Sequence, residues 1–428
     1  MIERRPKRRV LIIGAGRRVQ NNFLPVLEYL SASFEVCGIH SRTPATLNPV
    51  AERWLAPAIH TLEAIDLSKI DTVVVSVPTS QNATVLRRLQ ARAPGLDLVI
   101  DTPIAWNGVE QAETAPLLKA FRSVTVTEDY MNFPRFSLIR QVVRSGLIGE
   151  LKRITLNNIG YLYHGLALLR SFVGFGAVVD AWSKRVGHNA VIVGYEFADG
   201  FSATVVGPYR RHTTGGIVVE GTAGVISEFP FDQQAATAAK PVYLLSRIAT
   251  DGLLSGFEIR GPSQLVSLDL DAMRQMRRMP FTDKSDLNLE RGCGLIDVFR
   301  ALIEPHNLNH DYRVEDAFYD GFVSRRAEAG ERPLDPFNTF AHSAGAGAFL
   351  VAKVATFLKE TPRNAADLGP QQKIAVAPGA RLEVASSGSL DNHLILTGVK
   401  LNGETLENPS WFIYPPAWEI VGGGQSAP

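Results

Sequence analysis

The segment RVLIIGAGRRV, residues 9–19, decides the fold that this sequence predicts. Its first half, RVLIIG, is a short uninterrupted apolar run, which is typical of a strand buried on both faces of a parallel sheet. Apolar residues then recur at the spacing of one helix face, at Val19, Phe23, Val26, Leu27 and Leu30. Glycine at 14 permits a tight turn between the two elements. The segment therefore predicts a strand, a glycine turn and a helix in direct succession.

The same alternation continues through the first third of the chain. Strands are expected at 34–40, 71–78, 96–101 and 123–129, and helices at 83–92 and 108–121. Strand–helix alternation with short links predicts a parallel sheet wrapped by right-handed crossovers. We therefore predict an α/β class protein, with a doubly wound domain at residues 1–132.

The pattern changes after residue 132. A helix is expected at 135–146, closed by Gly146, and strand-like runs follow it, two of them separated by the turn ADG at 198–200. Residues 133–369 are therefore predicted to form an α+β domain with a largely antiparallel, open sheet. The apolar stretch GAGAFLVAKVATFL at 345–358 is expected to be a buried helix. Residues 370–428 are predicted to form a β-rich appendage, in which Asn402-Gly403 marks a hairpin.

Composition excludes several classes of partner. The 428 residues include 45% apolar and 20% charged residues and carry a net charge of +1, so nothing favours nucleic acid or an anionic membrane. No apolar run approaches the length that spans a bilayer. The basic cluster Arg4–Arg9 is expected to be a solvated leader, because the apolar run behind it is too short for an export signal. Cys37 and Cys293 show no paired spacing, so we expect reduced thiols and a cytoplasmic protein.

The loop GAGRRV, residues 14–19, has the placement of a phosphate-binding loop. It follows a strand and opens a helix, and glycine at 16 lets a pyrophosphate approach the backbone at the positive helix end. Val19 replaces the third glycine of the usual fingerprint. The loop predicts dinucleotide binding, with a glycine turn that binds no ligand as the alternative.

The end of the second strand bears on the choice of cofactor. An acidic residue at this place holds the ribose hydroxyls of NAD, whereas this chain has HSRT, residues 40–43. Ser41, Arg42 and Thr43 can donate hydrogen bonds to a 2′-phosphate. The sequence therefore favours NADP(H) over NAD(H), although Arg42 as a solvated turn residue remains open.

Six motifs in order resemble the glucose–fructose oxidoreductase / inositol dehydrogenase / MocA (Gfo/Idh/MocA) family: VLIIGAG, VVVSVPTSQN, VIDTP, EDYMNFPRF, SGLIGELKRI and YHGLALLR. The resemblance covers roughly residues 8–225 and is absent from the tail. It implies an N-terminal Rossmann domain and an α+β domain whose open sheet forms a homo-oligomer, as a dimer or tetramer. The active site would lie between them and bind a sugar, polyol, imine or related small molecule.

The chain departs from the family at its catalytic positions. Members usually carry Glu-Lys-Pro where this chain has Asp101-Thr102-Pro103, so the lysine is absent. Members also carry an aspartate four residues before a histidine and another three residues after it. In this chain Gly160 and Ala167 replace these aspartates. His164 and the trailing Arg170 remain, and Asn82 stands where relatives often have histidine. Members without the lysine, such as biliverdin reductase-like and thiazolinyl imine reductase-like proteins, reduce C=C or C=N bonds.

A proton donor other than lysine is then required. Thr102 is too weak an acid at neutral pH, whereas histidine titrates near neutrality, so His164 is the first candidate. Tyr130, Tyr161 and Tyr163 are the others. A histidine that caps the following helix, and tyrosines that only pack, are the alternatives. Glu128 ends a strand at the sheet edge where α/β folds bind ligands, and its alternative is a plain polar strand end.

Two functions follow from these residues. The first is an NADP(H)-dependent reductase of a small, biosynthetic C=N, C=C or C=O compound, in which Glu128 and Arg170 contact the substrate. No metal is expected, because His306 and His310 lack the pattern of a metal site. The second is a non-catalytic or non-redox descendant that only binds the dinucleotide. The predicted cofactor site comprises Gly14, Gly16, Arg17, Arg18, Ser41, Arg42, Thr43, Val77, Pro78, Thr79, Asn82, Asp101 and Pro103.

Overall fold

The fold was analysed in a computed structural model of the chain. It describes residues 6–421 apart from 94, 187–189, 199, 208–214, 230–239, 263–264, 280–282, 305–311, 331–348, 362–364, 366–367, 384–385, 391–392, 398, 407–410 and 414–417. Two compact units are distinguished, one of residues 1–105 and 116–332 and one of residues 106–115 and 333–428.

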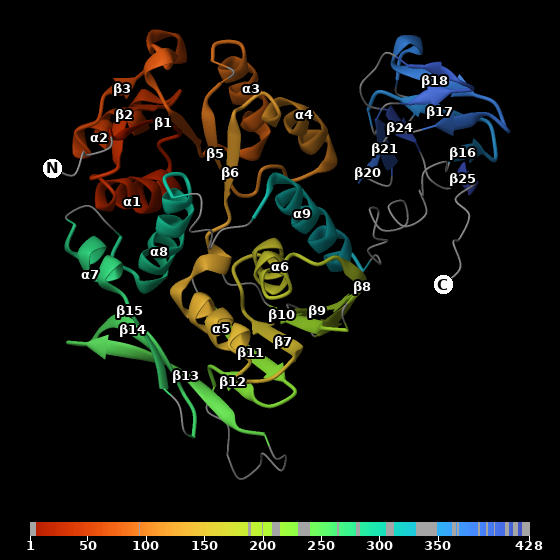
Figure 1. Cartoon of the computed structure of the whole chain (residues 1–428). Coiled ribbons are helices and arrows are strands. Elements are labelled where there is room, and N and C mark those ends of the chain that lie inside the picture. The colour runs from red at the N-terminus through yellow and green to blue at the C-terminus, as the bar shows by residue number, and fades with distance from the viewer. Residues whose placement is uncertain are drawn as a thin grey trace. The chain divides into compact units, whose positions relative to one another are not determined.

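The first unit begins with a six-stranded parallel sheet in the order β3-β2-β1-β4-β5-β6 (Figure 1). This is the doubly wound order that the strand–helix alternation predicts. The elements along this part of the chain are β1 (Arg8–Ile13), a π-helical turn (Val19–Phe23), α1 (Leu24–Tyr29), β2 (Phe34–His40), α2 (Pro44–Arg53), β3 (Ala58–Ile59), β4 (Thr72–Val75), α3 (Thr79–Gln90), β5 (Asp97–Asp101), α4 (Gly108–Leu118) and β6 (Ser123–Thr127). Residues 108–115 of α4 belong to the second unit.

The π-helical turn is a local departure from the predicted helix. It lies directly before Pro25, which has no N–H to donate to the preceding turn and so permits the wider winding there. The apolar face is nevertheless as predicted, because Val19, Phe23, Val26 and Leu27 are all buried in the core.

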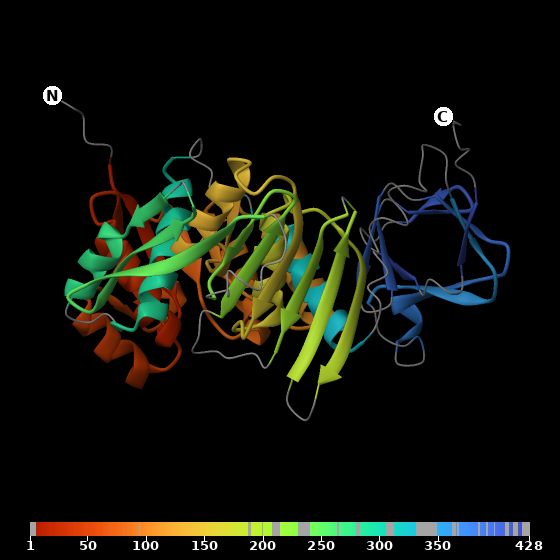
Figure 2. The ribbon, with the colours of Figure 1, turned by 90° about the horizontal axis from the view of Figure 1, so that it is seen from below.

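A nine-stranded sheet follows in the same unit, in the order β15-β14-β13-β12-β11-β7-β10-β9-β8. Most neighbours are antiparallel, and the pairs β7/β10 and β12/β13 are parallel. Figure 2 shows the strands on the near side with helices behind them, which agrees with the predicted open sheet. The elements are α5 (Pro134–Arg144), β7 (Leu151–Asn157), α6 (Leu162–Ser171), β8 (Val178–Val186), β9 (Ala190–Phe197), β10 (Ser202–Val206), β11 (Gly216–Gly221), β12 (Val225–Ser227), β13 (Val242–Thr250), β14 (Leu253–Arg260), β15 (Leu265–Asp269), α7 (Asp271–Arg278), α8 (Asp286–Ala301) and α9 (Val314–Glu328).

The second unit contains two five-stranded sheets, ordered β23-β22-β19-β16-β25 and β18-β17-β24-β21-β20. The predicted hairpin is present, because Asn402 and Gly403 both have positive φ between two paired strands. The strands are β16 (Phe349–Ala352), β17 (Thr356–Lys359), β18 (Lys373–Val376), β19 (Arg381–Glu383), β20 (Ser386–Leu390), β21 (His393–Thr397), β22 (Lys400–Leu401), β23 (Glu404–Thr405), β24 (Trp411–Ile413) and β25 (Trp418–Val421).

The buried helix predicted for residues 345–358 is wrong. The described part of that stretch forms β16 and the beginning of β17, which pair with strands on the far side of residue 370. Two short apolar runs with a turn between them have the length of strands, and β-branched Val351 and Thr356 favour strands.

Candidate active site

The glycine loop between β1 and the first helix is built as a tight turn. Gly14 has φ +126°, and a Cβ on it would stand 2.1 Å from the carbonyl oxygen of Ser76. Its N–H donates to the carbonyl of His40 at 2.8 Å, which fastens the loop to the end of β2. Gly16 differs, because a Cβ there would meet nothing within 4 Å. The backbone at Gly16 therefore faces open space where helical winding begins.

A pocket of about 540 Å³ opens at this loop, at the carboxyl ends of β1, β2, β4 and β5. Ten of the predicted cofactor residues line it: Gly14, Gly16, Arg17, Arg18, Ser41, Arg42, Thr43, Val77, Pro78 and Asp101. The sequence analysis missed further lining residues, namely Ile13, Ala15, His40, Thr46, Ser76, Gln81, Thr84, Val85 and Arg88. Ser76 directly follows the buried strand β4, at the sheet edge where open α/β folds bind ligands, and this position is the signal that could have identified it.

The end of the pocket beside β2 carries donors and no carboxylate. Arg42 donates from Nη1 to Oε1 of Gln81 at 2.9 Å, so its side chain is tied to α3. His40 is buried and donates from Nδ1 to the carbonyl of Ile59 at 2.7 Å. Asp101 is the single acidic residue among the described lining residues, and it belongs to the other end of the pocket.

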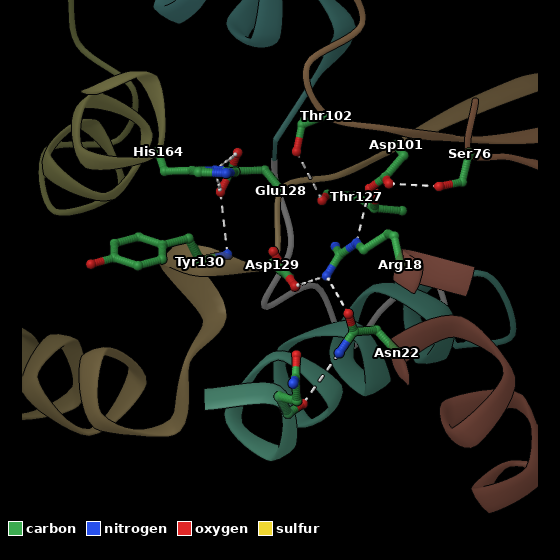
Figure 3. A network of polar contacts seen from close by, with 11 residues as sticks. Arg18, Asn22, Ser76, Asp101, Thr102, Thr127, Glu128, Asp129, Tyr130 and His164 are labelled. Atoms are coloured by element: carbon green, nitrogen blue, oxygen red, sulfur yellow. Dashed lines mark hydrogen bonds and ion pairs between the residues drawn. The ribbon is translucent and has the colours of Figure 1, made fainter. Parts of the chain in front are cut away.

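Arg18 does not point at the glycine loop but reaches to the carboxyl ends of β5 and β6 (Figure 3). Its Nε contacts Oδ1 of Asp101 at 3.3 Å and its Nη1 contacts Oδ2 of Asp129 at 2.8 Å. Burial alone would lower the pKa of Arg18, but the two carboxylates raise it above its usual value. Ser76 and Thr127 donate to the remaining lone pairs of Asp101 at 2.8 and 2.7 Å.

His164 and Glu128 form a second polar pair at this end of the sheet. Nδ1 of His164 lies 2.8 and 2.7 Å from the two carboxylate oxygens of Glu128, which is fully buried. The backbone N–H of Tyr130 also donates to Glu128. Since a carboxylate only accepts, Nδ1 of His164 carries a proton, and Nε2 is the ring nitrogen that Glu128 does not bind. Glu128 thus touches His164, and its predicted substrate contact finds no support in this geometry.

The helix that carries His164 does not use it as a cap. The residue that caps α6 is Tyr161, and His164 occupies the third helical position with its ring turned to Glu128. The chain of contacts is therefore continuous from the pocket to the histidine: Arg18 lines the pocket and binds Asp129, whose neighbour in sequence, Glu128, binds His164.

The three candidate tyrosines differ in position. Tyr130 is buried against Phe133 and Phe136, and its hydroxyl points away from Glu128 (Figure 3). Burial raises the pKa of both Tyr130 and Tyr163 above that of a free phenol. The ring of Tyr163 lies 4.1 Å from that of His164, and the ring of Tyr161 lies 5.6 Å from Tyr163. Tyr161 and Tyr163 therefore line the histidine, whereas Tyr130 supports it from the core.

Five predicted residues are placed elsewhere. Arg170 is buried and bound to Asp320 and Asp316 at 2.8 and 2.9 Å, which makes it a structural residue of the helix layer and leaves its predicted substrate contact without support. Asn82 donates to the carbonyl of Ile104 at 2.8 Å inside the core. Thr79 and Pro103 are not among the residues that line the pocket. Thr102 donates to the carbonyl of Thr127 at 3.4 Å, beside the pocket end formed by Asp101.

Comparison with known proteins identifies the Rossmann part of the chain. The sequence profile described as "Oxidoreductase family, NAD-binding Rossmann fold", that of Gfo/Idh/MocA, matches residues 8–130. Residues 8–130 thus match the Rossmann domain of Gfo/Idh/MocA-family oxidoreductases. The match supports an NAD(P)-dependent oxidoreductase. No curated protein matches the sequence.

Solved structures share the fold of this protein. An oxidoreductase from Agrobacterium radiobacter in complex with NAD+, L-tartaric acid and magnesium has 14% identity and a TM-score of 0.55, over 76% of this chain and 96% of that one. Levoglucosan dehydrogenase in complex with NADH and levoglucosan also has 14% identity and a TM-score of 0.55, over 76% and 97%. The transcriptional regulator Gal80p from Kluyveromyces lactis has 13% identity and a TM-score of 0.55, over 76% and 91%. At these identities the likeness concerns the fold.

The pocket beside the glycine loop fits a dinucleotide. The open space beside Gly16, at the start of a helix whose first N–H groups lack helical partners, suits a pyrophosphate. In the described part of the chain, no three His, Cys, Asp or Glu side chains gather closely enough to hold a metal ion. His306 and His310 lie outside the described residues. No helix among those described has the length and apolar character needed to cross a membrane.

We expect a Gly16→Val substitution to weaken dinucleotide binding by at least about tenfold while the protein stays folded, because the new side chain meets only the space of the pyrophosphate. Titration calorimetry and thermal unfolding measure the two effects. Gly95→Val is the matched control, since a Cβ at Gly95 also meets nothing within 4 Å but lies outside the pocket. Equal affinities of wild type and Gly16→Val would place the pyrophosphate elsewhere.

Proposed function

We propose that this protein is an NADP(H)-dependent reductase of a small, biosynthetic C=N, C=C or C=O compound, in which His164 supplies the proton. The observation that carries the proposal is the His164–Glu128 pair, joined through Asp129 and Arg18 to a pocket suited to a dinucleotide. A buried carboxylate that fixes the tautomer of a histidine beside a cofactor pocket is the arrangement of a general acid–base catalyst.

The chain's own residues divide the work of such a reaction. Gly14, Gly16 and the helix start would hold the pyrophosphate of the cofactor, which supplies a hydride when bound. Glu128 orients the ring of His164 through Nδ1, so that Nε2 carries the proton to or from the reactant. Tyr161 and Tyr163 cover the histidine and exclude water from that side. Thr102 cannot replace the lysine of relatives as an acid, because its hydroxyl holds its proton far too tightly.

The preference for NADP(H) rests on the residues beside β2. Arg42 is held at the pocket by Gln81, and Ser41 and Thr43 stand beside it. No negative charge that would repel a 2′-phosphate stands on Ser41, Arg42, Thr43 or His40. Charge-assisted hydrogen bonds from guanidinium to phosphate are among the stronger ones in proteins.

An Arg42→Ala variant is expected to bind NADPH about ten- to a hundredfold more weakly, because one charge-assisted bond to the 2′-phosphate is worth about 1.5–3 kcal/mol. Its affinity for NADH should stay within about twofold, since NADH has no such phosphate. Titration of both cofactors by nicotinamide fluorescence measures the effect, with Arg53→Ala as a charge-matched control outside the pocket. An equal loss for NADPH and NADH would refute the assignment of Arg42.

The proposal is tested by the consumption of NADPH in the presence of acceptors of three kinds: a ketone, a conjugated enone and a cyclic imine. The proposal requires oxidation of NADPH with at least one of them, at a rate that depends on His164. NADPH that stays reduced with every acceptor favours the second function, a descendant that binds the dinucleotide without redox chemistry. Thr102, Gly160 and Ala167 favour that alternative, and Gal80p, which shares the fold, is a transcriptional regulator.

We also propose that the protein is cytoplasmic and forms a dimer or tetramer through its nine-stranded sheet. Cys37 and Cys293 are both free thiols. Strand β8, at one edge of the sheet, exposes Val179, Trp182 and Val186, each more than 40% accessible. Exposed apolar side chains grouped on one strand are typical of an interface between subunits.

A further inference from the structure

The site around His164 holds an excess of negative charge. Three carboxylates, Asp101, Glu128 and Asp129, lie within one connected network, and Arg18 is its only fixed cation among the described residues. Even with His164 protonated, three negative charges face two positive ones. The side chains of Glu128 and Asp129 are at most 5% exposed, so water screens this excess poorly.

Aromatic rings line the same place. Tyr163, Tyr161 and Tyr130 all lie within 5.8 Å of the His164 ring, measured between ring centres. The faces of such rings carry partial negative charge and attract cations, most strongly where water is excluded. Burial is the main cause that raises the pKa of Tyr163, and the nearby charges of Glu128 and Asp101 raise it further. Carboxylates in excess together with stacked tyrosines form the usual chemistry of a cation-binding site.

We propose that the group reduced by this protein is a cationic nitrogen, an iminium that becomes an amine. The inference deepens the proposed function and rests on it for the hydride step, but the recognition of a cation rests on the charges and rings alone. It also explains how the site can work without the lysine at position 102. A neutral ketone needs an acid to activate it, whereas an iminium is already an activated electrophile.

The reaction balances with the residues present. His164 gives the proton on Nε2 to the nitrogen of a neutral imine, which forms the iminium. The iminium carbon then accepts a hydride from the reduced cofactor, and the C=N double bond becomes a single bond between carbon and the amine nitrogen. The products are an amine and the oxidised cofactor, and His164 recovers its proton from water. A substrate that arrives already as an iminium needs only the hydride.

The proposal is tested by binding, which does not require turnover. The probes are the permanent iminium 2-methyl-3,4-dihydroisoquinolinium, the neutral ketone 1-tetralone of similar shape, and the anion 2-naphthoate, each titrated calorimetrically into the full chain with NADP+ present. We expect the cation to bind at least about tenfold more tightly than the ketone, and the anion to bind least. Equal or tighter binding of the ketone or the anion, or no measurable binding of the cation, would overturn the proposal.

Two variants locate the effect. Asp129→Asn keeps an acceptor for Arg18 but removes one negative charge. It should lower the affinity for the cation about tenfold, while the affinity for the ketone changes less than about twofold. Asp71→Asn is the matched control, because Asp71 is exposed at the opposite end of the sheet, where it accepts from the backbone of Arg9. If Asp129→Asn does not fold, Tyr161→Leu should give the same selective loss. Unchanged selectivity in the folded variant would contradict the proposal.

The outcomes for the two proposals are distinguishable. A cation that binds selectively but leaves NADPH unoxidised would support the cation site and contradict the reductase. NADPH that is oxidised equally well by ketones, without selective binding of the cation, would support the reductase and contradict the cation site.

Discussion

A His164→Ala variant is expected to oxidise NADPH about 10²–10⁴-fold more slowly than the wild type, with the affinity for NADPH nearly unchanged. The magnitude is that of a positioned general acid. The affinity for NADPH should stay nearly the same because His164 does not line the dinucleotide pocket. Reduction of the best neutral acceptor, measured under single-turnover conditions, separates the chemical step from binding.

Two further variants sharpen this result. His60→Ala, at an exposed histidine of the same compact unit, should leave turnover unchanged. Glu128→Gln keeps an acceptor for Nδ1 but removes the charge, so we expect an intermediate loss. A fall of less than about threefold in His164→Ala would transfer the role of proton donor to Tyr161 or Tyr163, the two tyrosines that line the histidine.

Arg170→Met is expected to lower the free energy of unfolding by about 3–5 kcal/mol. Removal of one partner from a buried ion pair leaves the other charge uncompensated, and Asp320 is fully buried. Arg170 also donates to the carbonyls of Phe175 and Gly176 and stacks on Tyr319. Urea unfolding measures the loss, and Lys152→Met, which breaks an exposed pair with Glu150, should cost less than about 1 kcal/mol.

The loss in Arg170→Met should depend on pH with a definite sign. Burial raises the pKa of Asp320 to about 6. The folded state therefore binds the proton of the Asp320 carboxyl more tightly than the unfolded state does. The contribution of this carboxyl to stability is complete below about pH 4 and is lost as the pH rises through about 6. Arg170 offsets the charge above that pH, so the variant should lose more stability at about pH 8 than at about pH 5. An equal loss at both values would contradict the role of Asp320.

The Rossmann part of the fold could be predicted because its signals are local. Residues 10–13 are all apolar and residues 34–40 are mostly so, and β1 and β2 cover these two runs. Asn402-Gly403 predicts its hairpin for the same reason, since both residues tolerate positive φ. The stretch 345–358 was misread because a short apolar run has no period of its own, and pairing with strands far along the chain decided its structure.

The candidate site could be predicted only in part, because its pairings are distant in sequence. Glu128 and His164 were each identified, but the hydrogen bond between them spans 36 positions and leaves no mark on either segment. Arg18 was assigned to the cofactor from its place in the loop, whereas its reach across to Asp129 depends on the order of strands. Arg170 was assigned to substrate because sequence does not reveal that Asp316 and Asp320 bind it.

The most direct test of the reductase is transfer of the hydride itself. NADPH labelled with deuterium at the transferred position of its nicotinamide is mixed with the full chain and the 2-methyl-3,4-dihydroisoquinolinium probe, and the product is examined by mass spectrometry. The account predicts 2-methyltetrahydroisoquinoline with a single deuterium on carbon, formed at nearly the same rate by His164→Ala, because this iminium needs only the hydride. Labelled NADPH that remains intact, or a product without deuterium, would contradict it.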